Sequence, residues 1–105
     1  MAAKLIYTLI ARNDLQDIFD FISKRSLRYA QKEVRDIRTE IKNLKSNLYL
    51  GHPFYDANDE WTREFVYKNY RIIYLISSDF NQIQILTIHH HARLLTNNPA
   101  FDSED

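Results

Sequence analysis

The spacing of apolar residues changes from a helical period to a period of two near residue 60, and this change constrains the fold more than any other feature. Up to residue 48, apolar side chains recur every three or four positions, which is typical of amphipathic helices. From residue 61 onward, three segments rich in Val, Ile, Tyr and Phe (61–68, 69–78 and 82–90) predict strands. Helices followed by strands favour a fold in which helices cover one face of a sheet.

Two helices are predicted before this change. Residues 3–9 indicate a short strand, and the first helix follows it with Thr8 or Asn13 as the N-cap. Asp14, near the start of this helix, is expected on its solvent side. Ser26 is placed to cap a second helix, whose charged residues are expected to be solvated. Its apolar positions form an almost uninterrupted seam: Ala30, Val34, Ile37, Ile41, Leu44 and Leu48.

Helix breakers and turn residues separate these segments. Gly51, the one glycine, suits a left-handed helix cap, and Pro53 prevents the helix from continuing. Residues 78–81 supply a hairpin turn, where Asp and Asn tolerate the backbone angles needed. The order is therefore β-α-α-β-β-β, and we expect an α+β fold with an N-terminal strand and a helical hairpin packed on an antiparallel sheet, a two-layer sandwich. Residues 1–96 are expected to form a single domain, and residues 97–105 a frayed, polar, acidic tail.

Composition excludes several classes of function. A single glycine is too few for a phosphate-binding loop or a dinucleotide fingerprint. The absence of cysteine rules out disulfides and thiolate zinc sites, and it fits a cytoplasmic protein. No apolar run reaches the roughly 20 residues of a membrane span, so no membrane partner is expected. The net charge is zero, so any nucleic-acid binding would have to depend on a local patch.

Basic and titratable side chains interrupt the strand-forming segments between Trp61 and Arg93. Arg71 begins a strand face that is otherwise apolar, so it must pair with an acid such as Glu64 or grip an anion. Of the three consecutive histidines at 89–91, the outer two share a strand face and the middle one opposes them. One histidine could exchange a proton beside an arginine that stabilises a phosphate, or could simply hydrogen-bond at a sheet edge.

Two other roles are conceivable for this region. His89 and His91 could hold a metal together with His52 or a carboxylate, but nothing else has metal-ligand spacing, so we expect no metal and no cofactor. The tyrosines of the strands could stack on nucleic-acid bases, although tyrosines in strands are more often at the edge of a core.

The residues resemble the toxins of the RelE/ParE superfamily. The front half carries Ala11-x-x-Asp14-Leu15-x-x-Ile18-x-x-Phe21-Ile22, then the helical seam and Leu50-Gly51-x-Pro53. The back half carries Arg63-Glu64, Tyr70-Arg71-Ile72-Ile73-Tyr74 and Ile85-Leu86-Thr87-Ile88-His89-His90-x-x-Arg93. This resemblance spans residues 3–95, and the predicted order of elements is compatible with the superfamily fold.

The resemblance implies the toxin of a type II toxin–antitoxin module, a small cytoplasmic bacterial protein that inhibits growth when free of its cognate antitoxin. Such toxins, which include plasmid stabilisation proteins, contact operator DNA only through the antitoxin complex. ParE-like members inhibit DNA gyrase, whereas RelE-like members are metal-independent endoribonucleases that cut mRNA on the ribosome. The zero net charge, the lack of concentrated lysines and the long helical hairpin favour gyrase inhibition, while Arg71 with His90 favours the ribonuclease. A degenerate member that binds its antitoxin without toxicity is the third alternative, so whether the protein is an enzyme stays open.

The resemblance also implies roles for single residues. Arg71 matches an arginine of the penultimate strand in nuclease members, and His90 matches a last-strand position that holds a catalytic His or Tyr in some. Both would be catalytic only in a ribonuclease. The antitoxin is expected as an extended or helical segment on apolar grooves beside the helical hairpin, with acidic residues that could cover Arg71 and Arg93. Residues expected to bind the substrate or target are Arg63, Lys68, His91 and Arg93.

Overall fold

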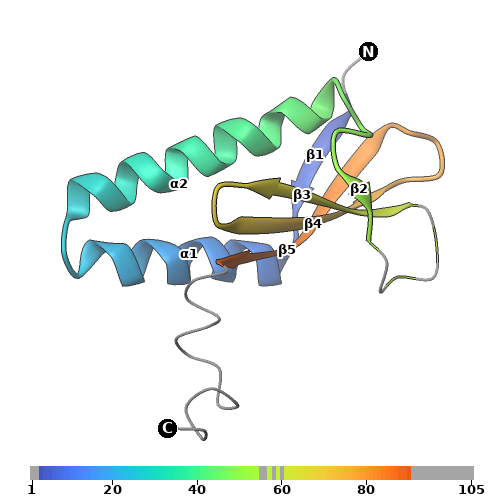
Figure 1. Ribbon diagram of the computed structural model, residues 1–105. Coiled ribbons are helices and arrows are strands. Elements are labelled where there is room, and N and C mark those ends of the chain that lie inside the picture. The colour runs from blue at the N-terminus through green and yellow to red at the C-terminus, as the bar shows by residue number, and fades with distance from the viewer. Residues whose placement is uncertain (1–2, 55–56, 58, 60, 91–105) are drawn as a thin grey trace, which may run out of the picture.

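Two helices cover one face of a five-stranded sheet in the computed structural model, which describes residues 3–54, 57, 59 and 61–90 (Figure 1). The helices are α1 (Leu9–Ser23) and α2 (Leu27–Lys42), and a short 3-10 helix (Asn43–Lys45) follows α2. The strands are β1 (Lys4–Tyr7), β2 (His52–Pro53), β3 (Thr62–Tyr67), β4 (Tyr70–Ile76) and β5 (Gln82–His90). None of the helices among these residues is long and apolar enough to cross a membrane.

Both helices begin at predicted caps. Thr8 precedes α1, and its side-chain oxygen accepts a hydrogen bond from Ala11 N at 3.0 Å. Ser26 plays the same part for α2, accepting from Tyr29 N at 3.1 Å. Thr8 rather than Asn13 is therefore the N-cap of α1, and the first strand ends earlier than residue 9.

The sheet has the order β1-β5-β4-β3-β2 and is mixed. β1 pairs with β5 in parallel, and the other neighbours pair antiparallel. The α+β class and the order of elements are as predicted, but the antiparallel description holds only from β5 to β2. The difference has a physical reason, because the apolar alternation of a strand is the same in both directions. β2 is an additional strand of two residues, too short to give a sequence pattern.

The core lies between the helices and one face of the sheet. α1 buries Ala11, Leu15 and Ile18, and α2 together with the 3-10 helix buries most of the predicted seam. Alternate residues of β4 face the helices and are almost completely buried: Tyr70, Ile72, Tyr74 and Ile76. The intervening residues of β4 lie on the opposite side of the sheet, which we call the open face.

Gly51 has a different role from the predicted one. Its φ is not positive, and α2 already ends at Lys42, so it does not cap that helix. A glycine is needed because a β-carbon at this position would clash with the backbone carbonyl of Glu64 on β3. Two side chains hold this close approach. Arg63 Nη2 donates to the Gly51 carbonyl oxygen at 2.5 Å, and the Tyr74 hydroxyl accepts from Gly51 N at 3.0 Å.

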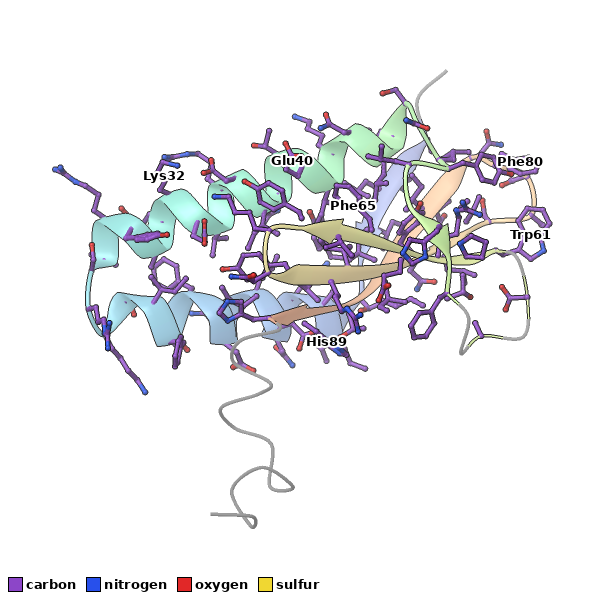
Figure 2. All side chains as sticks on the ribbon, viewed as in Figure 1. Lys32, Glu40, Trp61, Phe65, Phe80 and His89 are labelled. Atoms are coloured by element: carbon purple, nitrogen blue, oxygen red, sulfur yellow. The ribbon has the colours of Figure 1, made fainter. Side chains whose placement is uncertain are left out.

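Two large residues adopt left-handed backbone angles in the hairpin turns. Lys68 has φ 53° in the β3–β4 turn, and Phe80 has φ 60° in the β4–β5 turn. Side chains of this size rarely take that conformation. The turn chemistry favoured Asp79 or Asn81 for it, but the positive φ falls on Phe80, and Asp79 accepts a hydrogen bond from Ser77 Oγ at 2.7 Å. The Phe80 ring packs on Trp61 with ring centroids 5.4 Å apart, at the end of the sheet far from the α1–α2 connection (Figure 2).

Candidate functional site

The sheet divides the predicted basic residues between its two faces. In the register of β4 and β5, Arg71 pairs with His89 and Tyr70 pairs with His90. Paired residues project to the same side of a sheet, and neighbours along a strand project to opposite sides. Arg71 and His89 therefore share the open face, whereas His90 lies on the helix side. The structure does not bring together Arg71 and His90, which were predicted as a catalytic pair.

Glu64 is the centre of the polar residues on the open face. Its side chain is 9% exposed, and its carboxylate lies 3.6 Å from Arg71 Nε and 3.5 Å from His52 Nε2. The first contact is the ion pair that the sequence offered as the structural role of Arg71. The Arg71 side chain is still 53% exposed, so its guanidinium can also meet an anion from solvent.

Arg63 is engaged by the segment before β2. It pairs across the sheet with Tyr74 and so lies on the helix side, away from Arg71. Besides its hydrogen bond to Gly51, its guanidinium carbon lies 4.9 Å from the centroid of the Tyr49 ring. Its Nε is buried and has no hydrogen-bond partner among the described residues. These contacts make Arg63 a clamp on the chain between α2 and β2.

Lys68 belongs to a cluster on the helix side. Glu33 of α2 is buried, and it accepts a hydrogen bond from the Tyr70 hydroxyl at 3.1 Å. Lys68 Nζ lies 3.5 Å from the same carboxylate, and the His90 ring stacks on Tyr70 with ring centroids 4.7 Å apart. Burial and the Glu33 charge raise the pKa of Tyr70, and Glu33 also raises the pKa of Lys68. A neutral phenol and a charged ammonium therefore hold one carboxylate.

A groove runs between β1, α1 and α2 at the edge of the sheet, and we call it the β1 groove. Its two adjoining hollows, of about 550 and 580 Å³, have five residues in common: Leu5, Tyr7, Phe19, Val34 and Arg38. Its cationic wall residues are Arg12, Arg35, Arg38, Lys42 and Lys45. Neither lining includes a described Asp or Glu. An apolar floor with basic walls fits an amphipathic segment that carries carboxylates.

The charges of α2 are segregated rather than mixed, and this explains the basic wall. Side chains three or four residues apart lie on the same side of a helix. The cations follow that spacing along one side: Arg28, Lys32, Arg35, Arg38 and Lys42. The carboxylates follow it along another side: Glu33, Asp36 and Glu40. Within the groove, the Arg38 guanidinium carbon lies 5.1 Å from the centroid of the Tyr7 ring.

Two carboxylates of the helices contact strands, although the sequence indicated no such contact: Glu33 and Asp14. Asp14 was expected in solvent, yet its Oδ2 accepts hydrogen bonds from Thr87 Oγ1 at 2.6 Å and Ile88 N at 2.9 Å. His91, Arg93 and the tail at 97–105 lie outside the described residues, so their predicted roles stay predictions.

Comparison with known proteins gives a consistent picture. Residues 5–95 match the sequence profile of the ParE toxin of the type II toxin–antitoxin system parDE. A chain of the chromosomal ParDE system of P. aeruginosa aligns with a TM-score of 0.69 at 23% identity, covering 85% of this chain and 96% of that one. A chain of the RelBE2 toxin–antitoxin complex of Mycobacterium tuberculosis gives 0.60 at 20% identity, covering 86% and 99%. No curated protein matches the sequence.

Proposed function

The chain belongs to the ParE toxin family of type II toxin–antitoxin systems, and on this premise we propose that it inhibits growth by binding DNA gyrase without breaking a bond. The proposal places the protein in the bacterial cytoplasm, where gyrase and its DNA are. Binding to gyrase requires a complementary protein surface rather than a set of catalytic groups.

The separation of Arg71 from His90 is the observation that carries this proposal. A proton donor must lie within hydrogen-bond reach of the atom it serves, and an arginine that stabilises the same phosphate must lie beside it. Arg71 and His90 project from opposite faces of the sheet. Arg63 is also occupied by Gly51 and Tyr49. The basic residues thus support a binding activity better than a cleavage site built from the predicted pair.

Expression of the chain without a partner in a bacterial host tests the proposal. A DNA-damage reporter and primer extension on an abundant mRNA are read in the same culture. Gyrase inhibition predicts an active reporter and intact mRNA, and it predicts that Arg71→Ala and His90→Ala keep their toxicity at matched protein levels. Translation-dependent cuts with a silent reporter would contradict it. If both signals are absent and growth is normal, the result would support a degenerate, non-toxic member instead.

A ribosome-dependent endoribonuclease is the second candidate, and the register of β4 and β5 favours it. Arg71 and His89 are cross-strand neighbours on the open face, and both are exposed. If mRNA is cut, these two residues are better placed than His90 to act on one phosphodiester. In that case His89→Ala should abolish the cuts, while His90→Ala should weaken them only as far as it lowers stability.

The β1 groove is the proposed site for the antitoxin. The solved relatives from P. aeruginosa and M. tuberculosis come from a toxin–antitoxin system and a toxin–antitoxin complex. In this chain the groove combines an apolar floor with cationic walls, so we expect an amphipathic acidic segment of a cognate antitoxin to bind there.

A further inference from the structure

A hollow of about 410 Å³ lies between the first turns of α2 and the β3–β4 turn, outside both the β1 groove and the open face. Its lining residues are Ser26, Arg28, Tyr29, Lys32, Glu33 and Lys68. We call it the tip hollow, because the first turn of α2, which lines it, lies at the end of the molecule where α1 and α2 connect (Figure 1). Its volume is within the range of small-ligand sites in proteins.

Cations from two separate elements meet at the tip hollow. Arg28 and Lys32 come from one side of α2, and Lys68 comes from the β3–β4 turn. Lys32 pairs with Asp36 at 2.7 Å, whereas Arg28 makes no ion pair or side-chain hydrogen bond within the described part of the chain. Figure 2 shows Lys32 on α2, on the outer side of that helix. Arg28 therefore brings to the hollow a positive charge that no described carboxylate pairs with, beside two lysines that each pair with one carboxylate.

Lys68 is held at this hollow under backbone strain. Its φ of 53° is unusual for a side chain of its size, and such strain persists only where surrounding contacts enforce it. The β3–β4 hairpin imposes this angle, because Tyr67 and Tyr70 pair directly on either side of a two-residue turn, and the buried Glu33 contacts both Lys68 Nζ and the Tyr70 hydroxyl. Because Glu33 already has two partners, it acts as an anchor for Lys68 and leaves half of the lysine side chain exposed.

Tyr29 supplies an aromatic face beside these cations. The residue is 51% exposed, and it lies one turn before Lys32 and Glu33 on the same side of α2. An exposed ring next to cations is the arrangement with which proteins bind single-stranded nucleic acids, since bases stack on the ring and phosphates meet the charges.

Lys68 also links the tip hollow to the open face. It lines a second hollow, of about 220 Å³, together with Val66, Asn69 and Arg71. A backbone with phosphates at regular intervals could thus pass from Arg28 over Lys68 to Arg71, and continue toward His89 across the sheet.

We propose that the tip hollow binds one nucleotide of a single-stranded nucleic acid, with its base on the Tyr29 ring and its phosphate between Arg28 and Lys68. The site goes beyond the proposed function and does not require gyrase to be the target. Single-stranded RNA and single-stranded DNA share the chemistry that the hollow recognises.

Fluorescence anisotropy of labelled oligonucleotides with the full chain tests this proposal. Oligoadenylates of about eight nucleotides, in ribose and deoxyribose forms, are titrated at several salt concentrations. Tyr29→Ala should lower the affinity by about tenfold, because the stacked base loses its platform, whereas Tyr29→Phe should retain it. Arg28→Gln should reduce the slope of log affinity against log salt by about 0.7. Lys4→Gln removes one charge far from the hollow and is the matched control.

Every outcome of this titration bears on the site. A preference for one sugar supports the site and identifies RNA or DNA as the source of the strand. Absence of binding to either oligonucleotide would overturn the proposal. So would equal losses in Tyr29→Phe and Tyr29→Ala, or equal losses in Lys4→Gln and Arg28→Gln, since general charge attraction would explain those. The reporter assay on Tyr29→Ala tests gyrase inhibition separately, so the two proposals can fail independently.

Discussion

Glu33 occupies a position on α2 where a simple amphipathic helix would have a leucine. It lies three residues after Ala30 and four before Ile37, both fully buried, so helical spacing turns it toward the sheet. A buried carboxylate without partners would cost several kcal/mol. Tyr70 and Lys68 remove that cost by a hydrogen bond and an ion pair. Tyr70 and Lys68 occupy ordinary strand and turn positions in the sequence, yet both are held by the Glu33 carboxylate of α2.

Tyr70→Phe should lower the free energy of unfolding by about 2 kcal/mol. The change keeps the ring in the core and leaves one oxygen of a buried, charged carboxylate without its donor. Urea denaturation measures the loss. Tyr49→Phe is the control, because Tyr49 is exposed and keeps its ring against Arg63. Equal stability of the two variants would show that the Tyr70 hydroxyl contributes nothing.

Stability should fall as the pH rises above about 10, the ordinary pKa of a tyrosine. Burial raises the pKa of both Tyr70 and Tyr74 in the folded protein, so the unfolded chain releases those protons first. Their contribution is complete below the unfolded pKa and is lost as the pH approaches the folded value. Lys68, whose pKa is also raised, acts in the same direction. Unfolding curves from pH 9 to pH 12 measure this, and the slope should be smaller in Tyr70→Phe.

At the scale of elements, Thr8 and the first two turns of α1 replace β1 as partners of β5. β1 ends at Tyr7, which pairs with Ile85. Beyond that point, Thr8 Oγ1 donates to the Leu86 carbonyl oxygen at 2.9 Å, and Asp14 accepts from Ile88 N. The β4–β5 register also shifts here, so buried Ile85 and Ile88 are three residues apart rather than two. The side chains of Thr8 and Asp14 thus provide hydrogen-bond partners for the backbone of β5 beyond the point where β1 ends.

Asp14→Ala should therefore loosen the end of β5 that carries His89. The amide of Ile88 loses its acceptor, and we expect its hydrogen exchange to become faster by about tenfold or more. Hydrogen exchange followed by NMR measures this. Asp17 lies on the exposed side of the same helix, so Asp17→Ala should leave the Ile88 amide protected. Unchanged exchange in Asp14→Ala would contradict the capping role.

Gly51→Ala should destabilise the connection between α2 and β2. The added methyl group meets the Glu64 carbonyl, so the two backbones must move apart, at a cost of about 1–3 kcal/mol. That movement should also break the contacts of Arg63 and Tyr74 with Gly51. Thermal unfolding measures the effect, with Asn47→Ala, an exposed position in the same segment, as the reference. A change no larger than that of Asn47→Ala would remove the argument for close approach.

Across the whole molecule, local sequence patterns predicted the helices and strands. The pairing of distant segments determined the strand directions and which side chains lie together. The caps Thr8 and Ser26 and the apolar seam of α2 depend on neighbours within a few residues, and the structure confirms them. The parallel β1–β5 pair and the choice of His89 as the neighbour of Arg71 depend on register between distant segments. Gly51 shows the same dependence on a distant segment. A side chain is excluded at this position by the backbone of β3, and not by the conformation of its own turn.

The distribution of charge over the whole molecule leads to the last prediction. The net charge is zero, yet the β1 groove has cationic walls, so the antitoxin should bind more weakly as salt increases. Lys42→Glu should weaken the complex by about tenfold, whereas Lys24→Glu, outside the groove, should change the affinity little. Isothermal titration at several salt concentrations measures both. An affinity indifferent to salt would contradict an acidic segment in the groove.

The parallel pairing of β1 with β5 also has a consequence for synthesis on the ribosome. Thr8 and its acceptor on Leu86 are 78 positions apart in the chain. The α1–α2 hairpin can form early, but β1 has no strand to pair with until β5 has left the exit tunnel. The floor of the β1 groove includes Leu5 and Tyr7 of that strand. A nascent toxin therefore completes the surface proposed for its antitoxin only after β5 has emerged from the ribosome, which leaves an antitoxin little opportunity to bind that surface earlier.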